Sequence, residues 1–255
     1  MRTTATLHQV RQALERYLHE ERATPRAPRD PAVTILRATG CGAMTLARDL
    51  ARHLDHQDEE ERDWMVLDHD LVRQVCADPL IAELLVRRFP ETPEPTAGTL
   101  AGGTDGPHPA LSEALIRRVL TVRQLCRWGR VILVDRAASM MAAGLANTLH
   151  VRLVGSRERR VTRVMEQLDM GREEARAYVE EADAAQASYL QKHFAEPVNN
   201  ALRFHLALNT DLLSDESMLA TIAGSLKRLG RGTDWEAAAH PFVFTRGGTS
   251  APETR

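Results

Sequence analysis

Apolar residues follow two different spacings along the chain. Short apolar runs rich in valine, isoleucine and leucine predict buried strands, and they occupy residues 33–36, 64–67, 130–134, 149–154 and 204–208. Between these runs, apolar residues recur at three- and four-residue steps, which predicts helices at 5–22, 44–54, 69–76, 79–88, 111–128, 157–167, 173–193 and 214–229. This alternation predicts a three-layer α/β fold, in which a parallel sheet of about five strands has helices on both faces.

The same pattern divides the chain into three parts. Residues 1–31 carry an amphipathic helix and a proline-rich linker. We expect this helix to be an appendage outside the main fold that could bind a protein partner. Residues 32–230 form one domain, interrupted at 89–110 by a segment rich in glycine, proline and threonine that we interpret as a mobile loop or insertion. Residues 231–255 form a loose tail.

Charge and cysteine content narrow the class of protein. The chain has 33 basic and 35 acidic side chains, and because these charges nearly balance, we do not expect nucleic acid or an anionic membrane to be its partner. No apolar run approaches the roughly 20 residues that span a bilayer, and the N-terminus has no apolar signal core. Cys41, Cys76 and Cys126 lie far apart, so we expect neither a zinc site nor a disulfide framework. We therefore expect a cytoplasmic location. The ten histidines show no metal-ligand spacing, and we interpret them as surface or core residues.

A glycine-containing turn joins the first strand to the next helix. Ligands of parallel α/β sheets bind beyond the carboxyl ends of the strands, where this turn lies. Its glycines, Gly40 and Gly42, let backbone N–H groups converge on an anion at the start of a helix. The full GxxxxGK[ST] motif is absent, because Ala43 replaces the lysine and Thr45 follows one position late. Taken alone, the segment is equally explained as a tight strand–helix turn.

Several segments together resemble the cytidylate kinase-like branch of the nucleoside monophosphate kinases. They cover about residues 32–228 and occur in the family's order: TILR at 34–37 before the glycine loop, VILVDRAA at 131–138, LHVRLV at 149–154, RRVTRV at 159–164, residues 183–190 with Tyr189, and LNTDL at 208–212. The resemblance implies a phosphate-loop (P-loop) fold that binds ATP and Mg²⁺ and phosphorylates a nucleoside monophosphate.

The resemblance also implies a role for each matching residue of the donor site. Asn209 and Thr210 would border the base of ATP, and Thr45 would reach Mg²⁺. The donor phosphates would be wrapped by the loop residues Arg37, Thr39, Gly40, Cys41, Gly42, Ala43, Met44 and Thr45.

The acceptor side and the lid follow in the same way. Asp68 and Arg136 would face the acceptor nucleotide. Residues 155–195 would form a helical lid, in which Arg160 and Arg163 clamp the transferring phosphoryl group and Asp183 orients the lid. From this surface position, Arg160→Ala would lower activity far more than stability.

Two departures from the family pattern leave other functions open. Ala43 stands in place of the loop lysine and of a loop glycine, and Gln186 stands where the lid has an arginine. Loss of one such cation lowers phosphoryl-transfer rates by several powers of ten. The alternatives are therefore a catalytically inactive binding or regulatory module with the same fold, and a structural α/β protein without a nucleotide site.

The individual residues also have simpler explanations. Asp68 caps the following helix, Arg136 and Asp183 are solvent-exposed charges, and the arginines at 157–163 form a solvated helix face. Residues 209–210 would then form a plain turn. Cys41 is either a small residue that fits the loop or a redox-sensitive thiol beside a helix N-terminus.

Overall fold

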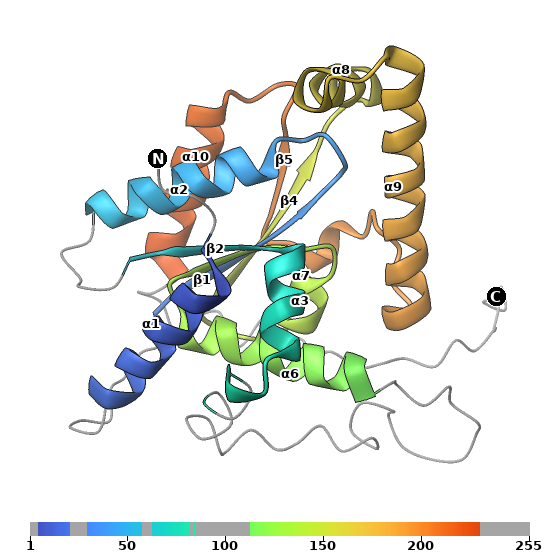
Figure 1. Ribbon diagram of the computed structural model, residues 1–255. Helices are drawn as coiled ribbons and strands as arrows, with labels where there is room; N and C mark the ends of the chain where they lie inside the picture. The colour runs from blue at the N-terminus through green and yellow to red at the C-terminus, as the bar shows by residue number, and fades with distance from the viewer. Residues whose placement is uncertain (1–4, 21–29, 58–62, 82–83, 85–112, 230–255) are drawn as a thin grey trace, which may run out of the picture.

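A sheet of five parallel strands forms the centre of the protein, with the strand order β2-β3-β1-β4-β5 (Figure 1). The structure is a computed structural model and describes residues 5–20, 30–57, 63–81, 84 and 113–229. The strands are β1 (Ala32–Arg37), β2 (Met65–Asp68), β3 (Val131–Val134), β4 (Thr148–Val154) and β5 (Leu206–Asn209). Every pairing within the sheet is parallel, so the predicted fold class is confirmed.

Helices cover both faces of this sheet. On one face lie α2 (Ala43–Gln57) and α10 (Asp215–Leu229). The other face is covered by α1 (Leu7–Glu20), α3 (His69–Ala77), α6 (Glu113–Trp128), α7 (Ala138–Met141) and the C-terminal end of α9 (Arg172–Phe194). Beyond the carboxyl ends of the strands, α8 (Arg157–Leu168) packs against α9 (Figure 1). None of the described helices combines the length and the apolar character needed to cross a bilayer.

The central position of β1 decides where a site can form. Residues 32–36 are buried on both faces, as expected for an inner strand of a covered parallel sheet. In the register, Ile35 lies opposite Val134 of β3 and Val151 of β4. Because the strands are parallel, their carboxyl ends meet at one edge, and the predicted site residues that follow them are brought together there.

The first helix belongs to the core, and the expectation of an outlying appendage is wrong. Val10 and Leu14 are almost fully buried and share a hydrophobic cluster with Leu71 of α3. Arg11 forms an ion pair with the buried Asp78 at 2.7 Å. The apolar face of α1 therefore packs within the chain, against α3, which itself lies beside β2 at the edge of the sheet.

Differences from the predicted elements are local. The last strand begins at Leu206, because Phe204 ends a short 3-10 helix, Ala201–Arg203, that the sequence pattern did not reveal. The short helix α7 was also missed, since its residues are all buried and show no periodicity. The predicted helix at 79–88 lies largely outside the described residues, and the segments at 89–110 and 231–255 lie wholly outside them.

Candidate functional site

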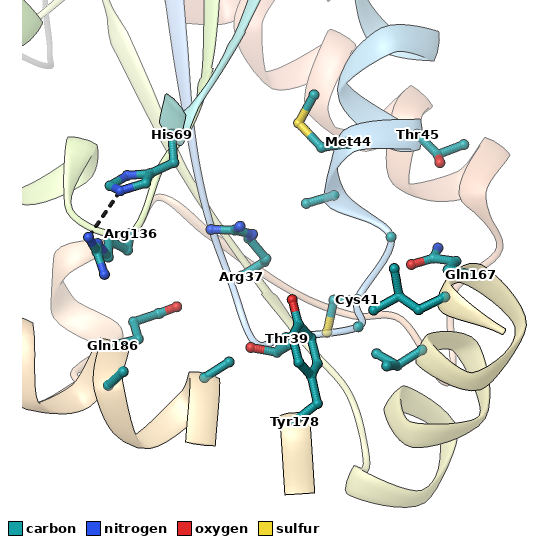
Figure 2. Close-up of a pocket in the computed structure, with 17 residues that line it drawn as sticks. Arg37, Thr39, Cys41, Met44, Thr45, His69, Arg136, Gln167, Tyr178 and Gln186 are labelled. Atoms are coloured by element: carbon teal, nitrogen blue, oxygen red, sulfur yellow. Dashed lines mark hydrogen bonds between the residues drawn. The ribbon is translucent and has the colours of Figure 1, made fainter. Parts of the chain in front are cut away.

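A cavity of about 390 Å³ opens at the carboxyl edge of the sheet, in front of the β1–α2 loop (Figure 2). All eight loop residues predicted to wrap the donor phosphates line it: Arg37 and residues 39–45. His69 and Arg136 lie on the far side of Arg37 from Met44 and Thr45 in this view. The remaining wall comes from α8 and α9, which contribute Val164, Gln167, Leu168, Tyr178, Ala182, Ala185 and Gln186.

The two glycines shape the loop in different ways. Both have left-handed backbone angles, with φ of 84° at Gly40 and 70° at Gly42. A Cβ at Gly40 would lie 2.6 Å from the carbonyl oxygen of Arg160, so this glycine allows α8 to approach. Directly after Gly42, α2 begins at Ala43. Its first N–H groups have no intrahelical acceptor, and together with the positive end of the helix dipole they favour an anion in the cavity.

Asp183 and Arg160 hold the loop in place from the side of α8 and α9. Oδ1 of Asp183 accepts a hydrogen bond from the Thr39 N–H at 2.9 Å, and Oδ2 accepts one from Nη1 of Arg160 at 2.7 Å. The same nitrogen donates to the Thr39 carbonyl oxygen at 3.0 Å, and Nε of Arg160 donates to the Gly155 carbonyl oxygen at 3.1 Å. Only 8% of Arg160 is exposed.

Arg160 and Arg163 do not close over the cavity, and this corrects the expectation for the lid. The guanidinium of Arg163 donates to Oγ1 and to the carbonyl oxygen of Thr210, both at 2.9 Å. Neither arginine is part of the cavity wall. The reason is that carbonyl groups at the strand ends and in the loop need donors, and the two guanidinium groups supply them.

Asp68, Asn209 and Thr210, which were also predicted from the resemblance, lie outside the cavity wall as well. Asp68 caps α3, with Oδ1 accepting from the Leu71 N–H at 2.8 Å, which is the simpler of the two explanations. Asn209 accepts a hydrogen bond from the Asp211 N–H at 2.9 Å, and Thr210 is 4% exposed behind the loop. Their predicted contacts with nucleotides stay predictions.

Cys41 lines the cavity but is not a reactive thiolate. Burial raises the pKa of its thiol and outweighs the opposing effects of a hydrogen bond with Thr210 and the charges of Arg160 and Arg163. The thiol is therefore protonated near neutral pH. Of the two explanations for Cys41, a small residue that fits the loop agrees with the structure.

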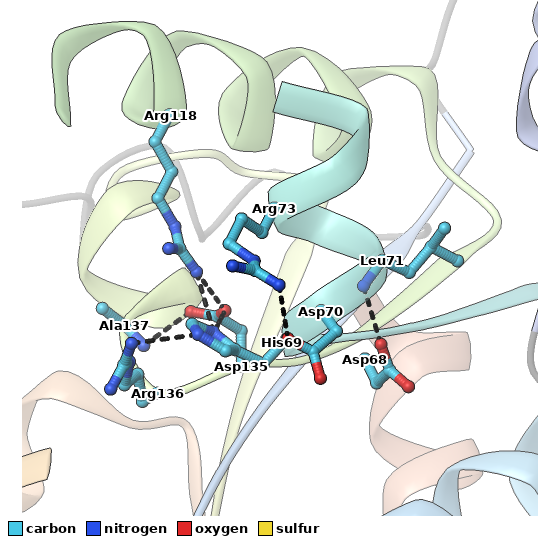
Figure 3. A network of polar contacts seen from close by, with 9 residues as sticks. All are labelled: Asp68, His69, Asp70, Leu71, Arg73, Arg118, Asp135, Arg136 and Ala137. Carbon is cyan, nitrogen blue, oxygen red and sulfur yellow. Dashed lines mark hydrogen bonds and ion pairs between the residues drawn. The ribbon is translucent and has the colours of Figure 1, made fainter. Parts of the chain in front are cut away.

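A network of four side chains around the buried Asp135 borders the part of the cavity lined by His69 and Arg136 (Figure 3). Asp135, at the end of β3, is fully buried and lies 2.7 Å from Nδ1 of His69 and 2.6 Å from Nη2 of Arg118. Nε2 of His69 lies 3.0 Å from Nη2 of Arg136. Arg136 also stacks on the ring of Tyr189, with its guanidinium carbon 4.7 Å from the ring centroid.

Asp135 decides which nitrogen of His69 carries the proton. Burial alone would raise the pKa of Asp135, but the hydrogen bond with His69 and the charge of Arg118 outweigh burial and lower this pKa. An ionised carboxylate only accepts hydrogen bonds, and Arg136 can only donate to Nε2, so we assign the hydrogen of His69 to Nδ1, which also lies 2.9 Å from Nη2 of Arg118. The lone pair of the neutral ring is then on Nε2, where Arg136 donates to it.

His69 is the functional candidate that the sequence interpretation missed. All histidines were interpreted as surface or core residues, yet His69 lines the cavity and joins two elements far apart in the chain. The signal was its position: it directly follows Asp68 at a strand end, where ligands of parallel sheets bind. Arg136, in contrast, was predicted and does line the cavity.

The two departures from the family pattern both face the cavity. Ala43 and Gln186 belong to its wall and are 5% and 7% exposed. The part of the wall formed by α8 and α9 is neutral, and the arginines of the wall are Arg37 and Arg136. Within the described part of the chain, no three metal-binding side chains form a cluster.

Comparisons with known proteins agree on family and fold. The sequence profile of the cytidylate kinase-like family matches residues 32–212. A protein from Eubacterium ventriosum, described as uncharacterized, superposes with a TM-score of 0.58 at 17% identity, covering 78% of this chain and 99% of that one. A gluconokinase from Sinorhizobium meliloti superposes less closely, with a TM-score of 0.43 at 10% identity over 82% of this chain and 98% of that one. Among proteins with curated descriptions, none matches the sequence significantly.

Proposed function

Because this chain belongs to the cytidylate kinase-like family, we propose that it is a P-loop phosphotransferase. It binds ATP at the β1–α2 loop and transfers the terminal phosphoryl group to an acceptor beside Arg136. A nucleoside monophosphate is the acceptor that the family name implies. The observation that carries the proposal is the loop itself: two left-handed glycines and a helix N-terminus that border a cavity of about 390 Å³.

Different residues around the cavity bind the phosphates, support the loop and bind the acceptor. The N–H groups at the start of α2 bind the phosphates, and Arg37 offsets part of their negative charge. Asp183 and Arg160 keep the loop in the required shape from behind. Arg136 attracts the acceptor on the opposite side of the cavity.

Magnesium fits the site only as a partner of the nucleotide. No described cluster of three ligands offers a metal cage of its own, but Mg²⁺ in such enzymes keeps several waters and is held by phosphates with one or two protein groups. The hydroxyl of Thr45, exposed at the cavity wall, would be one such group. When bound, Mg²⁺ neutralises charge on the phosphates during transfer.

A catalytically inactive nucleotide-binding module is the second candidate. It is favoured by Ala43 and Gln186, because both line the cavity where ordinary cytidylate kinases have a loop lysine and a lid arginine. Phosphoryl transfer depends on such cations more than phosphate binding does. The module would bind ATP and release no ADP.

Binding of ATP and ADP by calorimetry and by thermal shift tests the proposal. Ala43→Asp is the informative variant: an acidic residue in the first turn favours a helix, but its carboxylate would face the phosphates. We expect it to weaken ATP binding at least about tenfold; because Ala43 is only 5% exposed, circular dichroism of the unliganded variant is measured to verify that it folds. Ala220→Asp, at an exposed position of α10, is the matched control. If ATP, ADP and pyrophosphate all fail to bind the unaltered protein, the proposal is wrong.

A further inference from the structure

An imidazole backed by a buried carboxylate forms part of the cavity wall. Asp135 is fully buried and His69 keeps 24% of its side chain exposed, with 2.7 Å between Oδ2 and Nδ1. Arg118, from α6, neutralises the carboxylate at 2.6 Å. The hydrogen bond to Asp135 holds the ring so that Nε2, with its lone pair, faces the side of Arg136 and the cavity (Figures 2 and 3).

This arrangement is that of a proton acceptor. A carboxylate on Nδ1–H keeps an imidazole in one tautomer and stabilises the imidazolium that forms when Nε2 takes a proton. A general base so placed contributes about 100-fold or more to the rate of a reaction that needs proton removal. The transfer of a phosphoryl group to another phosphate needs none, because the acceptor phosphate is already ionised near neutral pH. Transfer to a hydroxyl group does, because the hydroxyl oxygen bears a proton when it attacks.

The charges of the cavity agree with a hydroxyl acceptor. A nucleoside monophosphate would bring a second phosphate close to those of ATP, and cations are needed to hold the two together. At Ala43 and Gln186 the wall is neutral, and so is the whole face formed by α8 and α9. The acceptor side offers one guanidinium, that of Arg136, which suits a single anionic group.

We propose that the acceptor is a small hydroxyl compound with one anionic group, and that Nε2 of His69 takes the proton of the hydroxyl that attacks ATP. The inference rests on the phosphotransferase function proposed above. The acceptor oxygen forms a bond to the terminal phosphorus as the bond from that phosphorus to the bridging oxygen breaks. ADP leaves with the electron pair of the broken bond, the product is a phosphate monoester, and His69 later releases the proton to water.

Arg136 couples binding of the acceptor's anionic group to exposure of Nε2 of His69. In the ligand-free protein, Nη2 of Arg136 donates to Nε2 of His69 at 3.0 Å and occupies its lone pair. The Nε atom of Arg136 is buried without a hydrogen-bond partner, so the guanidinium is incompletely satisfied in this position. An anionic group on the acceptor draws the guanidinium away and leaves Nε2 open to the hydroxyl.

Charged and titratable groups lie near His69 on several sides. Asp135 and Arg118 face Nδ1, and Arg136 faces Nε2. From α9, Tyr189 faces Arg136, and on α3 itself Asp70 pairs with Arg73 at 3.4 Å.

ADP release from ATP is the assay, with water, D-glycerate and glycerol 3-phosphate as hydroxyl acceptors and CMP, UMP and AMP as phosphate acceptors. Water is included because it is a hydroxyl acceptor that is always present. The variants are His69→Gln and Asp135→Asn, and His56→Gln, exposed on α2, is the control. Phosphorus NMR distinguishes a new phosphate ester from a new phosphoric anhydride, and ATP affinity is measured by calorimetry for each variant.

We expect phosphate ester as the product, or ATP hydrolysis where only water is present. In His69→Gln, kcat should fall about 100-fold, while ATP affinity and the acceptor KM should stay the same. His69→Gln provides this test even if Asp135→Asn does not fold. An effect confined to the acceptor KM would show a positioning role only and overturn the inference.

Other results separate the two proposals. If ATP binds and the product is an anhydride from CMP, UMP or AMP, with kcat unchanged in His69→Gln, the base and the acceptor class are wrong but the phosphotransferase stands. If ATP binds and no acceptor, water included, yields ADP, the base is overturned and the binding module remains. If ATP does not bind, both proposals fail.

Discussion

A buried pair of histidines makes the stability of the protein depend on pH. His150 of β4 is 5% exposed, with Nδ1 2.8 Å from the hydroxyl of the buried Thr34. Its ring stacks on that of His205 with 5.0 Å between the centroids, and the backbone N–H of His150 donates to Nδ1 of His205 at 2.7 Å. Burial, and to a lesser degree the proximity of His205, lowers the pKa of His150 from 6.5 to about 3.

The size of the effect follows from proton linkage. In the unfolded chain His150 takes up a proton near pH 6.5, whereas in the folded protein it stays neutral down to about pH 3. Its contribution to stability is therefore complete above the unfolded-state pKa and is lost as the pH falls toward the folded-state value. Between pH 7 and pH 5 this residue alone removes about 2 kcal/mol from the free energy of unfolding. Burial also lowers the pKa of His205, which acts in the same direction.

Urea unfolding at pH 7, 6 and 5, followed by circular dichroism, measures this free energy. His150→Gln cannot ionise, so its stability should fall by about 2 kcal/mol less than that of the unaltered protein over the same pH range. His56→Gln, exposed on α2, should follow the unaltered protein. The absolute stability of His150→Gln is not the test, because a core substitution has its own cost. Equal losses in the unaltered protein and in His150→Gln would refute the linkage.

Three further variants test the site. Arg160→Ala should lower the free energy of unfolding by about 2 kcal/mol, since Arg160 is 8% exposed and bonded to three acceptors, whereas the sequence placed it at the surface and predicted an effect mainly on activity. Unchanged urea unfolding would contradict this. Gly40→Ala should weaken ATP binding in calorimetry, because its Cβ would lie 2.6 Å from a backbone oxygen of α8; unchanged affinity would show that the loop shifts freely. Ala43→Lys combined with Gln186→Arg should raise the rate of ADP release at least about tenfold; no gain would mean that the cavity does not hold the transferring group.

The fold and the loop were predictable from the sequence because they depend on local patterns. Strand β1 is a short apolar run, and α2 follows two glycines, whose left-handed backbone angles strain residues that carry a Cβ. Parallel pairing then places every strand end at one edge, so the region of the site followed from the order of elements alone. Arg136 was found for this reason.

The contacts of individual side chains were not predictable in this way. Asp183 bonds to Thr39 across 144 positions of the chain, and His69 bonds to Asp135 across 66. No local pattern records such pairs, and the same motif residues could face either the cavity or the loop.

The sequence by itself determined a covered parallel sheet and a glycine bend at the end of its first strand, since hydrophobic periodicity and glycine geometry act over a few residues. Only the tertiary structure decided what the charged side chains do. Arg160 and Arg163 turn to carbonyl groups that the fold leaves without donors, and Asp135, buried beside Arg118, holds His69 at the cavity. Buried polar groups must find partners, and which partners are near depends on the packing of the whole chain.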